Sequence, residues 1–207
     1  MKNTAASMEN KVYGNLMAAY KKRQRTRLLL SAAVMVLGFI LCSTGIGGIA
    51  GLAAMLYLMM EGAKTCGMKL MRYKSLKMLK NSGKLKEAME SLANGKTQQL
   101  DGLTFAWSHD YFCTGYGAIY ETQQIAWMFP FTQTIRYFFI PVVRNHWCKM
   151  LMTDGTERIA FYGKAKDKEA FEKLLRGLRM ENPQLLIGHT QENMDRYQLR
   201  QTLSKAQ

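Results

Sequence analysis

Few side chains in this sequence have the types and spacing that catalysis requires. Cys113 and His146 could meet across strands and act as a thiol nucleophile and an imidazole base. No third residue that would orient the imidazole is evident. His109 beside Asp110 fits a turn better than a catalytic pair, because aspartate commonly stabilises turns. We therefore predict no catalytic residue, no metal site and no cofactor, and a protein that is not an enzyme.

The sequence also lacks the motifs of common nucleotide and hydrolase sites. The glycine-rich stretch GIGGIAG is not followed by the Lys-Ser/Thr of a phosphate loop, and GxSxG, HExxH and CxxC are missing. The four cysteines (Cys42, Cys66, Cys113 and Cys148) are widely spaced, which indicates neither a disulfide framework nor a zinc site.

Aromatic and basic side chains of the expected strands are the remaining candidates for a binding site. Trp127 and Trp147 could belong to an aromatic surface, although core packing would account for each of them as well. Arg144, Lys149 and Arg158 could form a basic patch that faces lipid head groups, although solvated strand faces would hold the same residues. We take these five residues as the candidate binding site.

A long apolar run must be placed before these candidates can be positioned. Leu28 to Met60 contains no charged residue, and as one helix it would extend about 50 Å, well beyond a hydrocarbon core of about 30 Å. Small residues interrupt the run near its middle, where we expect a turn (Ser43, Thr44, Gly45, Gly47 and Gly48). This pattern predicts a two-helix transmembrane hairpin with arms at about 28–43 and 46–62.

The distribution of charge supports a hairpin over a single span. The formal net charge is +14, and residues 101–207 are nearly neutral, so the excess flanks the apolar run. Basic residues on both sides of the run predict that both ends are cytoplasmic (Arg23, Arg25, Arg27, Lys64, Lys69 and Arg72). We therefore predict an integral membrane protein with both ends in the cytoplasm, which binds the lipid bilayer and no nucleic acid. Because the arms are short, a buried hairpin or a re-entrant loop stays open.

After the run, hydrophobic periodicity predicts an antiparallel β domain. Leu103, Phe105 and Trp107 alternate with smaller residues, which indicates a half-buried strand. We expect further strands at 111–113, 118–121, 125–131, 135–143, 147–153 and 156–162. Pro130 and Pro141 should lie at strand ends, edges or bulges, because proline lacks the N–H that a central strand needs.

Asp154-Gly155 between two strand patterns predicts a type I′ hairpin with a two-residue loop. That loop would pair Met150 with Ile159 and Cys148 with Phe161. An amphipathic helix then follows, with Asp167 as its N-cap and its apolar face towards the strands, and it should end at Asn182-Pro183. The fold class expected from these elements is α+β, a membrane hairpin followed by a small antiparallel barrel or sandwich that a C-terminal helix covers.

The expected organisation has five parts. A basic N-terminal helix spans 1–27 and the hairpin spans 28–62. A basic amphipathic connector spans 63–95, the β domain spans 96–183, and a partly helical tail spans 184–207.

Four short segments carry a resemblance to a known family. They are Ile125-Ala126-Trp127, Thr153-Asp154-Gly155, the helix Ala170 to Leu178, and the stretch from Asn182 to Gly188. Over about residues 28–197 the chain resembles an uncharacterised family of bacterial membrane proteins with a two-helix transmembrane hairpin and a pleckstrin-homology-like domain. The resemblance implies this architecture and a place in the bacterial cytoplasmic membrane, and it leaves the activity open.

Two functions are compatible with this reading. The first is a membrane-anchored interaction or scaffolding module on the cytoplasmic face, with an unknown protein partner or a second copy of itself. The alternative is a protein that senses or handles anionic phospholipids at the inner leaflet. A lipid sensor should lose vesicle binding as salt increases, because its basic residues would be screened.

Overall fold

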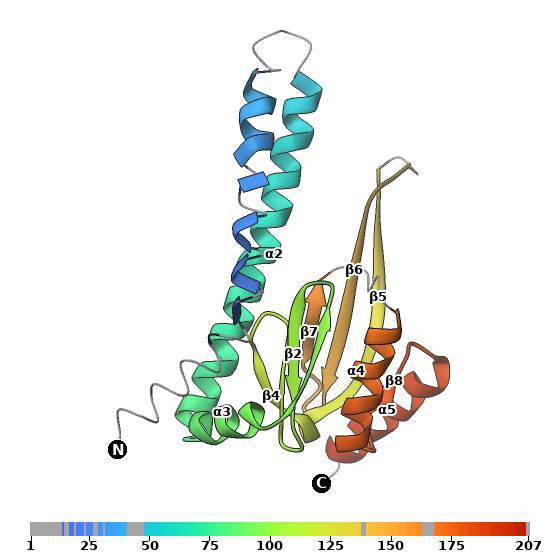
Figure 1. Ribbon diagram of the computed structural model, residues 1–207. Coiled ribbons are helices and arrows are strands. Elements are labelled where there is room, and N and C mark those ends of the chain that lie inside the picture. The colour runs from blue at the N-terminus through green and yellow to red at the C-terminus, as the bar shows by residue number, and fades with distance from the viewer. Residues whose placement is uncertain are drawn as a thin grey trace, which may run out of the picture.

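The fold consists of one antiparallel β-sheet and one mixed β-sheet, with helices packed around them (Figure 1). The structure is a computed structural model, and it describes residues 14, 17–18, 20–22, 24–26, 29–30, 32–40, 48–137, 140–162 and 168–205. The helices are α2 (Gly48–Asn81), α3 (Leu85–Ala93), the 3-10 turn η1 (Thr122–Gln124), α4 (Lys168–Glu181) and α5 (Gln191–Lys205). The strands are β1 (Lys96–Leu100), β2 (Leu103–Trp107), β3 (Tyr111–Cys113), β4 (Ile119–Glu121), β5 (Ile125–Tyr137), β6 (Ile140–Met152), β7 (Glu157–Tyr162) and β8 (Leu186–Ile187).

Each sheet has four strands. The first sheet has the order β1-β2-β3-β4, and the second has the order β7-β6-β5-β8. All neighbours pair antiparallel except β5 and β8, which are parallel. The chain passes from the first sheet to the second through η1, between β4 and β5. Strands β5 and β6 form a ribbon that rises well beyond the other strands (Figure 1).

The main hydrophobic core lies between the two sheets, and α4 closes it. Phe105 of β2 contacts Phe161 of β7 edge to face, with 5.6 Å between ring centroids. Met150 of β6 and Leu174 and Leu178 of α4 are almost fully buried in the same cluster. Because β-strands alternate their side chains, each sheet has a second face that other elements must cover.

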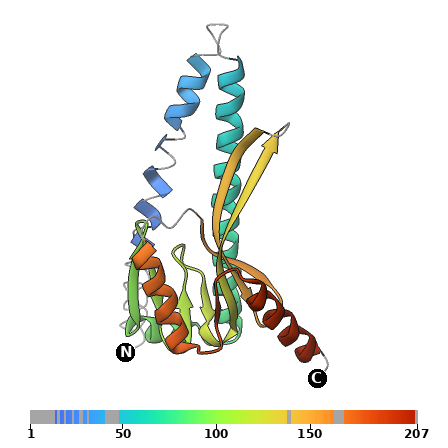
Figure 2. The ribbon, with the colours of Figure 1, turned by 90° about the vertical axis from the view of Figure 1, so that its right-hand side faces the viewer.

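Helices cover these second faces. Leu79 of α2 and Leu92 of α3 pack on Ala106 and Cys113 of the first sheet. Met194 of α5 packs on the outer face of the second sheet, near Trp127 and Phe129. Figure 2 shows α5 leading away from the base of the ribbon, so it covers only part of this face.

The predicted membrane-spanning hairpin is wrong for the residues that the structure describes, since none of their helices is long and apolar enough to cross a membrane. Helix α2 shows the reason. Its uncharged part, Gly48 to Met60, is shorter than the roughly 20 residues that a span needs, and the same helix continues through Glu61 and Lys64 into the basic segment. The predicted location in the bacterial cytoplasmic membrane depended on this hairpin, so the same finding contradicts it.

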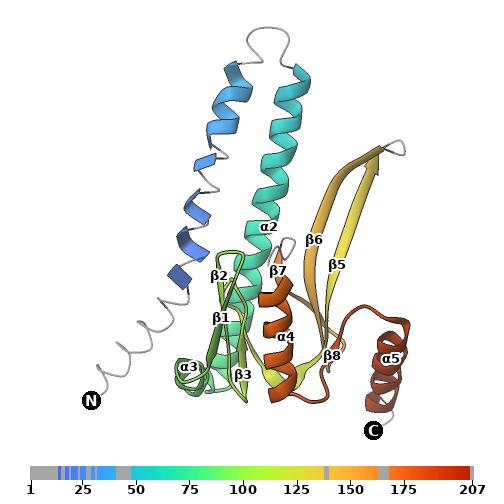
Figure 3. The same ribbon diagram turned by 45° about the vertical axis from the view of Figure 1, so that its right-hand side comes forward.

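Described helical pieces nevertheless lie beside α2. The helical pieces between residues 14 and 40 run back alongside α2 (Figures 1 and 3), and Met17 and Tyr20 are buried in the same core cluster as Met68 of α2. Several apolar side chains of residues 29–40 are more than half exposed, including Phe39. The turn expected near Gly45 lies outside the described residues.

The expected barrel is also corrected. The described strands form two separate four-stranded sheets that do not close into a barrel. The long ribbon explains part of the difference, because β5 and β6 each have 13 residues and continue away from the first sheet. The strand expected at 135–143 is wrong: it contains the end of β5 and the start of β6, so the chain reverses inside it.

The two Asp-Gly pairs of the sequence form different turns. At Asp101-Gly102 both residues have positive φ, 51° and 71°, and the two-residue loop joins Leu100 to Leu103, as in a type I′ hairpin. At Asp154-Gly155 only the glycine has positive φ, and Met152 N–H donates to the Thr156 carbonyl at 2.9 Å. The type I′ prediction was therefore wrong for the β6–β7 turn.

The pairing of β6 with β7 differs from the expected register near this turn. Cys148 pairs with Phe161 as predicted, but Ile159 pairs with Lys149 instead of Met150, because an irregularity between Cys148 and Lys149 shifts the register by one residue.

The end of α4 is tied to the start of β5 by one buried side chain. The Asn182 amide nitrogen donates to the carbonyl oxygens of Thr122 at 3.0 Å and Ile125 at 2.9 Å, and Asn182 is only 2% exposed. Its own N–H continues the helix by donating to Leu178 at 2.8 Å. These bonds hold α4 against the crossing between the two sheets.

Replacing Asn182 with alanine should lower the free energy of unfolding by about 2 kcal/mol, because two bonds to buried backbone are lost. Urea unfolding followed by circular dichroism measures the change. Asn94→Ala is the matched control, since the Asn94 amide also bonds a carbonyl, that of Glu90, but is exposed. We expect less than about 0.5 kcal/mol for the control. Equal losses in both variants would contradict the role of Asn182.

Candidate functional site

A cleft of about 580 Å³ lies between α4 and the middle of the β5–β6 ribbon. Aromatic and aliphatic side chains form most of its wall, with a few polar groups among them. The lining residues are Pro130, Phe131, Thr132, His146, Trp147, Phe161, Lys168, Phe171, Glu172, Leu175, Ile187 and Gly188. A concave, mainly apolar site of this size with few polar groups is typical of ligand-binding pockets.

The cleft exists because the ribbon is longer than the helix that covers it. Strands of 13 residues extend about 43 Å, whereas the 14 residues of α4 extend about 21 Å. Figure 3 shows the ribbon rising beyond α4. At this level the face of the ribbon towards α4 carries Pro130, Thr132 and His146, whereas Phe131 and Trp147 pair with each other on the opposite face; side chains of both faces contribute to the lining.

Helix α4 forms the opposite wall through its helical periodicity. Leu174 and Leu178 point into the core, while Phe171 and Leu175 are shared between the core and the cleft. Gly177 fixes the position of the helix along the sheet, because a Cβ there would lie 2.5 Å from Cζ2 of the Trp107 ring.

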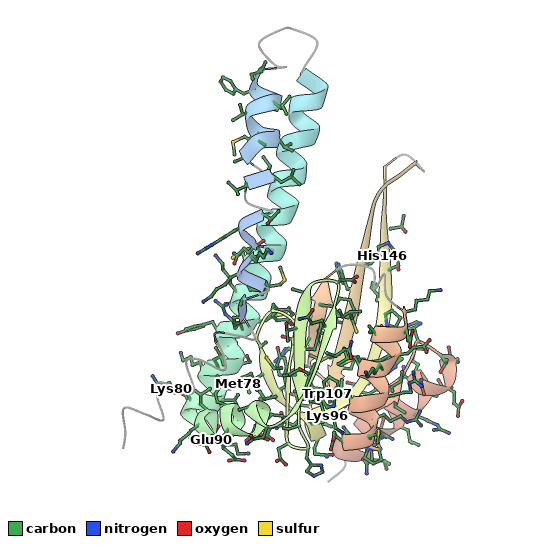
Figure 4. All side chains as sticks on the ribbon, in the orientation of Figure 1. Met78, Lys80, Glu90, Lys96, Trp107 and His146 are labelled. Carbon is green, nitrogen blue, oxygen red and sulfur yellow. The ribbon has the colours of Figure 1, made fainter. Side chains whose placement is uncertain are left out.

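The rim of the cleft carries its polar groups. Lys168 and Glu172 are one helical turn apart on α4, and both are exposed. On the ribbon, the Thr132 hydroxyl and His146 Nδ1 are 2.9 Å apart and form a hydrogen bond. Figure 4 places His146 on the part of the ribbon beyond α4, away from Trp107. The polar groups thus flank an apolar centre.

Two of the predicted binding residues come together on the ribbon. Lys149 Nζ lies 5.8 Å from the Trp147 ring centroid and 4.2 Å from that of Phe131. The same ammonium forms an ion pair with Glu157 at 2.9 Å, and its side chain is only 15% exposed. Trp147 lines the cleft, whereas Lys149 is already paired within the chain.

Trp127 has a structural role. It is 3% exposed, and its Nε1–H donates to the Gly188 carbonyl at 2.8 Å. Its ring packs on Phe129 at 4.4 Å between centroids and lies 5.8 Å from His189. Trp127 therefore holds the end of β8 beside β5 and does not itself line the cleft.

The predicted basic patch is not assembled by the described residues. Arg158 pairs across strands with Met150, so it shares the face of Met150, while Lys149 lies on the opposite face. Arg144 lies in β6 opposite Thr134, and its side chain is outside the description.

Of the basic residues that were expected to flank a membrane, those that the structure describes lie in helices. Arg25 lies in the N-terminal helical segment, and Lys69 and Arg72 lie in α2. Lys64 is also in α2, but its side chain is not described, and Arg23 and Arg27 lie outside the described residues.

The residues considered for catalysis are separated. Cys113 lies in β3 of the first sheet and His146 in β6 of the second. His109 Nδ1 lies 3.7 Å from a Glu181 carboxylate oxygen, and that carboxylate also pairs with Lys96 at 2.9 Å. Among the described side chains, no three His, Cys, Asp or Glu residues lie close enough together to hold a metal ion.

Sequence reasoning missed the helical wall of the cleft and the short strand β8. Pro130 was the available signal, since a proline inside a strand pattern predicts an edge, and β5 is an edge strand beyond its short pairing with β8. Comparison with known protein families, with curated proteins and with solved structures found no match. The resemblance to a pleckstrin-homology-like membrane family therefore stays a prediction.

Burial makes two of the cysteines unreactive. It raises the pKa of the Cys113 thiol to about 12, and it also raises the pKa of the Cys148 thiol. Since the thiolate is the reactive form, neither should react with iodoacetamide at pH 8 in the folded protein, whereas the exposed Cys66 should. Peptide mass spectrometry after labelling, with and without urea, measures each site. Labelling of Cys113 at the rate of Cys66 without urea would contradict this assignment.

Proposed function

We propose that this chain is a binding module that holds an apolar segment of a partner protein in the cleft between α4 and the β5–β6 ribbon. The observation that carries the proposal is the cleft itself, about 580 Å³ with a mainly aromatic and aliphatic lining. Such a volume accommodates a few large apolar side chains. Burial of aromatic and aliphatic groups there would supply most of the binding free energy.

The polar groups of the cleft suit recognition. The Thr132 hydroxyl and His146 Nδ1 bond each other in the lining, where they can also offer a hydrogen bond to a ligand. Lys168 and Glu172 lie at the rim, where charged groups set orientation and contribute less to affinity. The proposal therefore assigns a binding role and no chemical step.

The proposal keeps the interaction role expected from the sequence and omits membrane anchoring. Anionic-lipid sensing has weaker support, because it depended on a basic patch. Lys149 is paired with Glu157 and faces away from Arg158, so these two residues do not form one cationic surface.

Selection from a phage-displayed library of random 12-residue peptides on the full-length chain tests the function. Peptides that bind the cleft should lose at least about tenfold in affinity for Glu172→Trp, because the indole would occupy the cleft. Fluorescence polarisation of the labelled synthetic peptides measures this loss.

Glu169→Trp is the matched control. Glu169 is exposed on the same helix but does not line the cleft, so this variant should bind the selected peptides normally. If both variants bind equally well, or if no peptide distinguishes the cleft, the proposed function is wrong.

A further inference from the structure

The short strand β8 points to the way in which the cleft takes its ligand. β8 pairs with β5 only at Trp127 and Met128, in parallel. The last bond of this ladder runs from the Gly188 N–H to the Met128 carbonyl at 3.1 Å. In a parallel ladder the next bond would run from the N–H of residue 130 to the Gly188 carbonyl.

That bond cannot form, because residue 130 is proline and has no N–H. The Gly188 carbonyl instead accepts from Trp127 Nε1 at 2.8 Å and from Asn193 Nδ2 at 3.0 Å. Gly188 itself has φ of +88°, which turns the chain away from β5. Pro130 and Gly188 thus end the β8 pairing at the mouth of the cleft.

Beyond Pro130 the outer edge of β5 is open among the described residues. The Met128 carbonyl faces this edge, and the register with β6 is regular from Trp127 to Ile135. Main-chain groups alternate along a strand, so the N–H and C=O of Thr132 and Thr134 face the same edge. No described strand other than β8 pairs there. An edge of this kind is a template for another strand.

The open edge and the cleft are continuous. Pro130 and Thr132 contribute to the lining, and so do Ile187 and Gly188 at the end of β8. A segment that adds to β5 beyond Gly188 would continue the line of β8. Every second side chain of that segment would then point towards the apolar wall of the cleft, because side chains alternate between the faces of a sheet.

The charge of this region selects among occupants. Apart from Lys149, which is paired with Glu157, residues 122–153 contain two basic residues, Arg136 and Arg144, and no aspartate or glutamate. A partner with acidic residues is therefore electrostatically complementary, whereas a second copy of the ribbon would bring like charges together.

We infer that the cleft binds its ligand by strand addition: an extended, acidic segment of a partner protein, apolar at alternate positions, pairs with the β5 edge from Thr132 onward. This inference rests on the proposed function and specifies the partner chemistry of the same site. Main-chain hydrogen bonds would align the segment, and the cleft would select its alternate side chains.

The peptides selected on the full-length chain test the inference through their pattern. Strand addition predicts apolar residues at every second position, interspersed with aspartate and glutamate. Methylating single backbone nitrogens of the best peptide should weaken binding at least about tenfold at alternate positions only, since only every second N–H faces β5. Cleft-dependent peptides with helical spacing would overturn the inference and leave the proposed function intact. Absence of any cleft-dependent peptide would overturn both.

A protein variant tests the edge directly. Thr132→Pro removes the outward N–H and should weaken the best peptide at least about tenfold, while leaving the β5–β6 bonds in place, as Pro130 does. Thr132→Val keeps the N–H and removes only the hydroxyl that bonds His146, so it measures what the hydroxyl contributes; Thr132→Pro should weaken the peptide at least about fivefold more than Thr132→Val does.

Normal binding by Thr132→Pro would overturn the inference. Sedimentation of the chain without peptide tests the second-copy alternative, and a dimer that Thr132→Pro abolishes would also overturn it. If Thr132→Pro does not fold, as judged by circular dichroism, the methylated peptides decide the question.

Discussion

The buried amide of Asn182 bonds the carbonyl oxygens of Thr122 and Ile125 at the place where the chain leaves the first sheet and enters the second. Both sheets, α4 and β8 meet at this point. The bonds fix where α4 ends, and hence where the segment to β8 begins. Pro183 follows at once, so the helix cannot continue and the chain must turn back towards β5. The cleft, which lies between α4 and β5, therefore depends on an interaction about one helix length away.

The ribbon adds the second constraint. Two paired strands are a weak structure by themselves and need a third strand or a helix for independent stability. At its base the ribbon has β7 on one edge, β8 on the other and α4 across one face. Beyond α4 it keeps only its own pairing among the described residues. The cleft lies where the part of the ribbon that α4 covers meets the part that has only its own strand pairing.

Local patterns predicted much of the β domain. The alternation of Leu103, Phe105 and Trp107 identified β2, and the apolar face of α4 was correct over Ala170 to Leu178. The turns were harder to predict, because an Asp-Gly pair is compatible with more than one loop. At Asp154 the carboxylate accepts from the Thr156 N–H at 2.8 Å and from its hydroxyl at 2.6 Å, which favours a longer loop than the type I′ turn at Asp101-Gly102. A dipeptide cannot show which side-chain bond its neighbours will offer.

The apolar run and the cleft show the limits of one-dimensional patterns more clearly. The hydropathy pattern shows an uncharged run from Leu28 to Met60. It cannot show that the residues from Gly48 onward belong to a helix that continues through Glu61 and Lys64 to Asn81. Likewise, hydrophobic periodicity places Phe171 and Leu175 on the apolar face of α4. It cannot show that the ribbon extends beyond the helix, so that these two side chains also line the cleft. Pro130 is the exception, because a proline cannot donate a backbone hydrogen bond to a neighbouring strand wherever it lies. It marked an edge in the sequence, and in the structure the same missing group ends β8 and leaves the rest of that edge to another strand.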